Sequence, residues 1–363
     1  LTLNNNTMKI KKNPFILVAI ISLLLIGGKV IAQEQIAIYL RGNIGDAEKL
    51  ATAYMKPFGN MFGNSLNGGW YTSAKPHGLF GFDVTFNFTM AMAPSSDKTF
   101  DVTKLGLTSL SPVDPAKVNS QSIAGSKTTG PAMTYTQNVN GTDFTTQFNL
   151  PKGAGISLTP MPMIQASIGL PYHTELIGRF FPTVDIPKVG KFGMWGFGIK
   201  NEFKEFIPGF KRLPFNVSFL FGYTKLTSEF DVSYKPDVYT VAGKNSTAYK
   251  NQKLDLNAKG YTARLLIGKS IPILTVYAGV GYSKSKTDID LKGNYPFGLA
   301  DDAGTIKVAD NSDIVNPLSM NFNDSGVSFN AGLRVKLSVI AFHFDYTVGK
   351  YALYNAGVGI NFR

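Results

Sequence analysis

The feature that most constrains this chain is an unbroken alternation of apolar with polar or small residues from Phe80 to Met92. Neighbouring side chains of a strand point to opposite faces, so one face of this segment is apolar and the other is polar. Strands of soluble proteins are usually about 5 or 6 residues long, whereas a tilted strand that crosses a membrane needs about 9–11. With its 13 residues, the segment predicts a strand with one face toward lipid and the other toward an aqueous interior.

Nine further segments repeat this alternation. They are residues 164–170, 175–180, 195–200, 217–224, 261–268, 274–283, 327–337, 342–348 and 355–362. Most connections alternate between short (171–173, 270–272, 338–341) and long (93–160, 231–256, 288–323), as in outer-membrane barrels, although 202–213 is long for a turn and 350–352 is short for an outer loop. The sequence therefore predicts an all-β fold, a transmembrane antiparallel β-barrel of ten strands over residues 78–363. The number rises to 12 or 14 if 93–160 contains a further hairpin, for example around Phe144 to Phe148.

The first 32 residues have the pattern of an export signal. Lys9, Lys11 and Lys12 precede an apolar run at 15–26, and small residues precede Gln33. The alternative is a retained membrane anchor, but the run is shorter than the roughly 20 residues of a spanning helix. Removal of residues 1–32 lowers the net charge from +12 to +8. An exported basic chain meets outer-membrane lipid and lipopolysaccharide phosphates before any nucleic acid, so we expect no nucleic-acid partner.

Residues 33–77 precede the first strand and differ from the rest of the chain. Apolar residues recur at helical spacing over 44–55, which predicts a short helix there. The stretch 56–70 is rich in Gly, Asn and aromatic residues and is expected to be neither helix nor strand. We expect this N-terminal helix and hatch segment to enter the barrel, where many inward glycines leave space. The expected hatch side chains are Tyr54, Phe58, Met61, Phe62 and Trp70.

Charged residues of both signs fall on the inward face of the predicted strands. They are Asp83, Glu175, Arg179, Lys200, Arg264, Arg334, Lys336, His343 and Asp345, and we expect them to line the lumen. Because an unpaired charge in a poorly hydrated interior is costly, these groups should pair with one another or with the hatch. A selective pore would instead need them at one constriction.

The sequence gives little support for catalysis or metal binding. His343 and Asp345 share an inward face and could form an acid–base pair, but no nucleophile is expected near them at the outer rim. His77 and His173 are expected to be solvated or interfacial. The chain has no cysteine, and the acidic clusters at 301–302 and 310–313 miss the spacing of a calcium loop. We therefore expect no enzymatic activity, no metal and no cofactor.

The C-terminal segment is an alternating strand that ends at Phe362, followed only by Arg363. It resembles the C-terminal strand of bacterial outer-membrane proteins, which the barrel-assembly machinery reads through a terminal aromatic residue. This resemblance implies a bacterial outer-membrane location and that machinery as a partner.

Three blocks carry a wider resemblance that covers most of the chain. They are Gly169-Leu170-Pro171 with Thr174-Glu175-Leu176, the block Trp195 to Lys200, and the block Ile207 to Pro214. In these the chain resembles an uncharacterised family of Bacteroidetes outer-membrane proteins, which has no assigned activity. A hatch before a monomeric barrel is also similar, in architecture only, to the long-chain fatty-acid transporter family.

Two hypotheses for function follow. The first is a monomeric barrel that binds or passes a small, hydrophobic molecule, with the N-terminal segment as gate. The second is a structural or accessory envelope barrel that acts through a protein partner. A lumen packed without a ligand cavity would count against the first.

Overall fold

The computed structural model describes residues 44–139, 142–186, 190–204, 208, 210–231, 251–300 and 306–362. The predicted export signal, Asp301, Asp302 and Arg363 lie outside the described residues.

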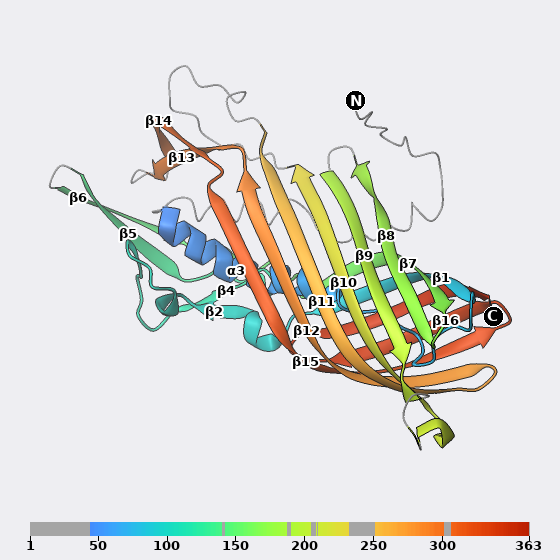
Figure 1. The fold of residues 1–363 in the computed structure, drawn as a ribbon. Helices are drawn as coiled ribbons and strands as arrows, with labels where there is room; N and C mark the ends of the chain where they lie inside the picture. Colours follow the sequence, from blue (N-terminus) through green and yellow to red (C-terminus); the bar gives the residue numbers. More distant parts are fainter. Residues whose placement is uncertain are drawn as a thin grey trace, which may run out of the picture.

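Ten antiparallel strands form one closed barrel (Figure 1). In chain order they are β1 (Phe82–Met92), β7 (Leu158–Leu170), β8 (Thr174–Ile186), β9 (Gly190–Glu202), β10 (Asn216–Asp231), β11 (Lys253–Ser270), β12 (Leu274–Lys292), β15 (Leu318–Leu337), β16 (Ile340–Val348) and β17 (Ala352–Phe362). β1 closes the barrel because it pairs with β17 on one side and with β7 on the other. The predicted fold class and the number of ten strands are confirmed. No helix among the described residues is long and apolar enough to cross a membrane.

The long connection between β1 and β7 contains short elements that stay outside the barrel. They are η1 (Ser95–Asp97), β2 (Thr99–Asp101), η2 (Val102–Leu105), β3 (Leu110–Pro112), β4 (Asn119–Gln121), β5 (Ala132–Val139) and β6 (Thr142–Asn149). The hairpin expected around Phe144 exists as β5–β6, but it pairs with β3 in a separate sheet. The alternative of 12 or 14 barrel strands is therefore wrong. In β6, polar residues at 145–147 separate Phe144 from Phe148, so neither face of this strand is apolar enough for lipid.

Two further elements lie at the two ends of the barrel. The hairpin of β13 (Asn294–Ala300) and β14 (Ile306–Val315) follows β12 at the end where the long connections lie, and the residues at 310–313 belong to β14. The short helix η4 (Phe210–Arg212) lies between β9 and β10 at the opposite end, where the short turns are.

The N-terminal helix α3 (Ile44–Ser65) is longer than expected, because it continues through Pro57 for two more turns. The expectation that 56–70 is entirely non-helical was wrong. Close packing explains the difference: a Cβ at Gly59 would lie 2.3 Å from Phe322, and one at Gly63 would lie 2.7 Å from the Ser285 side chain. The two glycines bring the helix against the barrel wall. Burial there offsets the weak helix propensity of Gly and Pro.

The strands change the polarity of both faces along their length. In β11, Tyr261, Leu265 and Ile267 point outward and are 40–47% exposed, while Thr262 and Arg264 point inward and are buried. We call this part the belt region; it reaches from the short turns to Tyr223, Tyr261 and Tyr282.

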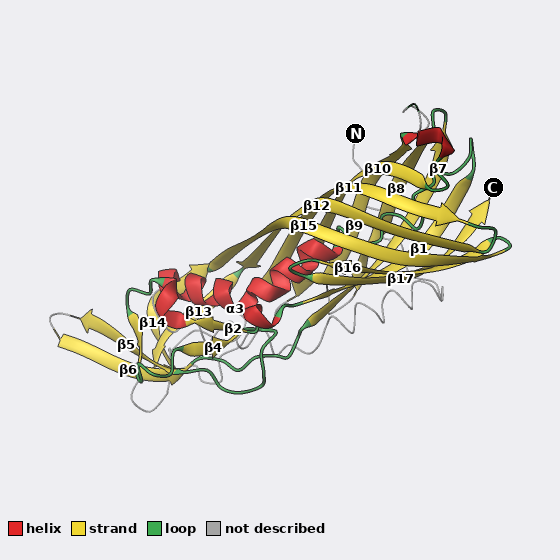
Figure 2. Cartoon of the chain, turned by 90° about the horizontal axis from the view of Figure 1, so that it is seen from below, coloured by secondary structure: helices red, strands yellow, loops and turns green. Residues whose placement is uncertain are grey.

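Beyond the belt region the same strands reverse this arrangement. In β11, Leu254 and Leu256 point inward and are buried, whereas Asp255, Asn257 and Lys259 point outward. We call these extended strand ends, together with α3, residues 93–157 and the β13–β14 hairpin, the outer region. One hydrophobic core joins its four parts. Figures 1 and 2 show α3 at this end of the barrel, inside the long strands.

The reversal explains why the sequence-based strands end too early. β10, β11, β12 and β15 have 16, 18, 19 and 20 residues, and parts of the expected loops 231–256 and 288–323 are their continuations. The outward face of each strand becomes polar there, so the pattern of outward apolar residues ends before the strand does.

Candidate functional site

Residues 66–77 run through the lumen from the end of α3 to the start of β1, and we call them the plug. Arg179 of β8 binds the part of the plug next to α3, which we call its upper part. Its guanidinium donates to the carbonyl oxygens of Leu66 (3.0 Å) and Gly68 (2.6 Å) and to Oε1 of Gln165 (2.9 Å). It also lies 3.6 Å from the centre of the Trp70 ring, and Nε2 of Gln165 donates to the Trp70 carbonyl at 3.3 Å. Arg179 is therefore tied to the plug by charge, hydrogen bonds and ring contact together.

Inward glycines make room for the plug. A Cβ at Gly198 or Gly222 would lie 2.8 or 2.5 Å from the ring of Trp70, which is 1% exposed. Gly69 has a φ of +66°, a left-handed conformation that favours glycine, and it lies directly before this ring. The glycines on the wall and in the plug thus let a bulky aromatic side chain fill the lumen.

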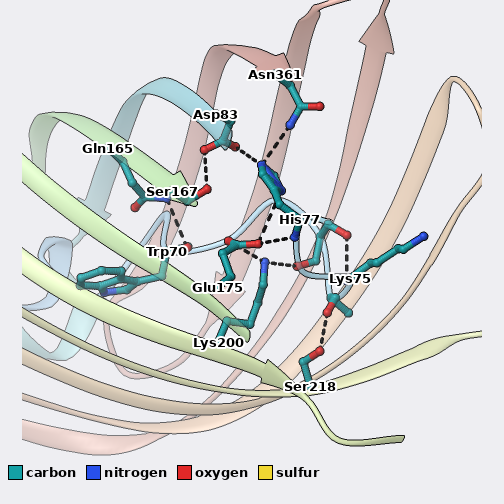
Figure 3. A network of polar contacts seen from close by, with 12 residues as sticks. Trp70, Lys75, His77, Asp83, Gln165, Ser167, Glu175, Lys200, Ser218 and Asn361 are labelled. Carbon is teal, nitrogen blue, oxygen red and sulfur yellow. Dashed lines mark hydrogen bonds and ion pairs between the residues drawn. The ribbon is translucent and has the colours of Figure 1, made fainter. Parts of the chain in front are cut away.

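His77 anchors the lower end of the plug (Figure 3). Its backbone N–H donates to Oε2 of Glu175 at 2.9 Å, and its ring lies between two carboxylates, 3.5 Å from Glu175 and 3.4 Å from Asp83. Asn361 contacts the same ring at 3.0 Å. Lys200 Nζ lies 3.0 Å from Oε1 of Glu175, so the cluster around the imidazole contains two carboxylates and one ammonium group.

The wall also satisfies the backbone of the plug between these anchors. Lys200 donates to the carbonyl of Ser73 at 3.2 Å, and the Ser218 hydroxyl donates to the carbonyl of Ala74. Ser167 donates to Asp83 at 2.6 Å and so orients the carboxylate beside His77. A chain without regular secondary structure needs such partners for its buried carbonyls.

A second polar cluster surrounds Asp345 on the opposite wall. The carboxylate accepts from Tyr277 (3.2 Å), Asn330 (2.8 Å) and Asn355 (2.8 Å). Tyr71 of the plug donates to Oδ1 of Asn330 at 2.9 Å. This cluster therefore also reaches the plug, through one amide.

The remaining predicted lumen residues bond to the wall or line a small void. Arg264 donates to Thr262 and Ser328, at 3.2 and 2.9 Å, and Lys336 donates to Asn361 at 2.7 Å. Arg334 and His343 line a void with Thr72 that is too small to admit a water molecule.

The hypothetical acid–base pair does not form. His343 Nε2 has no hydrogen-bond partner among the described residues, and Asp345 is bonded by the three side chains described above. The part of the chain that the structure describes also contains no group of three or more His, Cys, Asp or Glu placed to hold a metal ion.

The expected hatch residues divide between two places. All five are buried, but Tyr54, Phe58, Met61 and Phe62 belong to α3, and only Trp70 lies in the plug. The expectation that His77 is solvated or interfacial was wrong, because its side chain is only 9% exposed. A signal was available, because His77 lies shortly before a strand whose first inward residue is Asp83. His173 is exposed in its turn, as expected.

The plug fills the described lumen, because the inward side chains of β1 from Asp83 to Thr89 are at most 7% exposed. Wall residues from β1, β7, β8, β9, β10 and β17 bond to it or to its anchoring side chains. The arrangement resembles a seal, because the buried polar groups of the wall bind the backbone of the plug.

Comparisons with known proteins identify the family of the chain. No curated protein sequence matches it. Among solved structures it is similar to the translocator domain of the autotransporter NalP from Neisseria meningitidis (12% identity, 86% of this chain and 99% of that chain, TM-score 0.32). It is also similar to Ail of Yersinia pestis (7%, 78% and 100%, 0.23) and to the toluene transporter TbuX of Ralstonia pickettii (8%, 83% and 93%, 0.18). Residues 8–362 match one family over nearly the whole chain, and the protein therefore belongs to DUF6588, a family of unknown function.

Proposed function

We propose that this protein spans the bacterial outer membrane as a monomeric barrel sealed by its own plug, and acts through its outer region as a structural or accessory component with a protein partner. The belt region supports the location, because its apolar side chains face outward and its interior is polar. Short turns at one end and long connections at the other support an orientation with the outer region on the cell surface.

The filled lumen is the observation that carries the proposal. The plug is bonded at its upper end by Arg179, at its lower end by Glu175, and in between by Lys200 and Ser218. Removing it would leave the buried Arg179 guanidinium with Gln165 as its remaining partner, and Lys200 and Glu175 with each other, so the loss falls mainly on Arg179 in a poorly hydrated interior, which is costly. The outer region, in contrast, offers exposed surface: Val113 and Val315 are 43% and 63% exposed.

A second candidate is the gated passage of a small hydrophobic molecule. It is favoured by the irregular conformation of the plug, which is held by side chains rather than by a strand or helix of its own. Such a segment can leave without breaking a regular hydrogen-bonded ladder. The family assigns no ligand to this route.

A disulfide between plug and wall separates the two candidates. A Cβ at Gly268 would lie 3.1 Å from the Cβ of Ala74, a little inside the spacing of about 3.5–4.5 Å in disulfides. The chain has no cysteine of its own, so Ala74→Cys with Gly268→Cys gives one defined crosslink. The two single variants are the controls.

In planar bilayers, we expect a sealed barrel to show no steady conductance, in the wild type and in the double variant, whether oxidised or reduced. Openings that oxidation stops and reductant restores would establish the gate instead. Openings that persist in the oxidised protein would overturn the seal as well.

The partner is tested with photo-crosslinking residues at Val113 and Val315, compared with Tyr172 at the short turns, which is 80% exposed. We expect one discrete adduct in living cells from an outer position and none from Tyr172. Adducts only from Tyr172, or from no position, would contradict action through the outer region.

A further inference from the structure

Three lysines face outward side by side at the border between the belt region and the outer region. Lys225 of β10 is paired in register with Lys259 of β11, which is paired with Lys286 of β12. We call them the lysine row. Like charges directly opposite one another on neighbouring strands are destabilising, so this row calls for a compensating anion.

The row lies directly beyond the aromatic end of the belt. Tyr223 and Tyr261 are in register one pleat closer to the short turns, with ring centres 4.9 Å apart, and Trp195 lies 5.4 Å from Tyr223. Lys284 is in register with Tyr261 and adds a fourth cation at that level. Aromatic residues of this kind mark the level of lipid headgroups.

The lysine row has almost no acidic partner within the described chain. No ion pair joins Lys225, Lys259 or Lys284 to any described residue, and Lys286 lies 3.5 Å from Asp288. The next carboxylates along these strands are already engaged. Glu229 lies 2.8 Å from Lys253, Asp255 lies 2.7 Å from Lys292, and Asp290 accepts from Ser319 at 2.7 Å.

An apolar surface lies on the same strands, between the lysine row and the short turns. Its members Phe219, Leu265, Val280 and Tyr282 are 39–53% exposed. A ligand that reaches both surfaces must carry anionic groups at one end and hydrocarbon chains at the other.

We propose that the lysine row and Lys284 bind the phosphate groups of an outer-leaflet glycolipid whose acyl chains lie along the belt. Ammonium groups bind phosphate as compact point charges, and two phosphates can bridge neighbouring lysines and remove their mutual repulsion. This inference rests on the proposed membrane placement, with the long connections outward.

The test uses the purified full chain in zwitterionic detergent and measures its binding of bisphosphorylated lipid A by native mass spectrometry. The variant carries K225Q, K259Q and K286Q. The matched control carries K98Q, K127Q and K152Q, which removes the same charge from exposed lysines of the outer region that form no ion pair with a described residue. Heat-modifiable migration in gels confirms that each barrel is folded.

We expect the affinity to fall about fivefold for each lysine removed, and so about 100-fold in the triple variant. The control should keep wild-type affinity, and 0.5 M salt, an about threefold to fivefold rise in ionic strength over physiological, should weaken wild-type binding. Dephosphorylated lipid A and inorganic phosphate should both bind poorly, since each lacks one half of the ligand.

Equal loss in both variants, or none in the row variant, would overturn the proposal. Strong competition by inorganic phosphate would show a free-anion site and overturn the lipid assignment. Separation of cell membranes by density tests the location independently. Lipid binding by a protein found elsewhere would therefore contradict the placement but not the chemistry of the row.

Discussion

The belt region and the outer region are built from the same strands with opposite rules. In the belt, β12 directs Val276, Val280 and Tyr282 outward and small or polar residues inward. Farther along, it directs Lys284 and Lys286 outward and Ile289 inward, where Ile289 is fully buried. The proposed membrane placement accounts for the difference: the belt would meet lipid outside and polar wall groups inside, whereas the outer region would meet water outside and has an apolar helix inside.

The two segments inside the barrel, α3 and the plug, are held by different kinds of contact. α3 packs through apolar side chains in one core with the extended strands and 93–157, as in a soluble domain. The plug is held by hydrogen bonds to charged wall residues and by the contacts of His77 with two carboxylates, in addition to a small apolar cluster that its Trp70, Tyr71 and Ala74 form with the wall. The outer region should therefore tolerate loss of one polar contact better than the plug does.

The largest effect is expected from Arg179→Ala. The substitution removes two charged hydrogen bonds, to the buried carbonyls of Leu66 and Gly68, at a cost of about 3–5 kcal/mol, and leaves the Leu66 carbonyl with the longer bond from Thr224 at 3.3 Å. Hydrogen exchange should accelerate in residues 66–77 and remain unchanged in α3. Equal acceleration in both segments would show that plug and helix behave as one unit.

A smaller effect is expected from charge on the lipid-facing side. Leu265→Arg should lower the free energy of unfolding by about 2–4 kcal/mol if the side chain lies near the middle of the bilayer. Asn257→Arg, on the same face of the same strand in the outer region, is the control and should change it by less than about 0.5 kcal/mol. Denaturant titration in vesicles measures both, and similar costs would contradict the boundary drawn at Tyr261.

The smallest effect concerns the start of α3. Burial raises the pKa of Asp46, but backbone N–H groups of Ser109 and Thr108 donate to its carboxylate at 2.8 Å each, and the net pKa is below the ordinary 3.8. The charged form therefore stabilises this contact above that pH, and the stabilisation is lost as pH falls through the lowered pKa.

We expect Asp46→Asn to cost about 1.5–3 kcal/mol locally at neutral pH and to abolish this pH dependence. Spin labels on α3 and near Ser109 would report the separation of the two segments as pH falls. A pH profile that is the same in wild type and variant would assign the contact to other groups.

Much of the barrel could be predicted from the sequence, because strands with an apolar outward face and a polar inward face give a regular period of two. The parts that escaped prediction break that regularity. The outer halves of β11 and β15 reverse their polarity, and α3 continues through Pro57 because Gly59 and Gly63 fit against Phe322 and Ser285. The β5–β6 hairpin was anticipated as a hairpin, but its place outside the barrel depends on pairing with β3.

The candidate site was only partly within reach of the sequence. The alternation places Glu175, Arg179 and Lys200 on the inward face, yet nothing in it says that His77 lies between Glu175 and Asp83. That arrangement depends on how far α3 extends, because the helix length sets where the plug enters and where it ends.

By itself, then, the sequence determined which ten segments form the barrel and which face of each is apolar, since both follow from local period and polarity. Only the tertiary structure decided that the lumen is closed, which wall residues hold the plug, and that lysines from three strands form one row. Those facts depend on register and on contacts between residues far apart in the chain. Local sequence carries no record of such contacts, because each of them is set by the closure of the whole barrel.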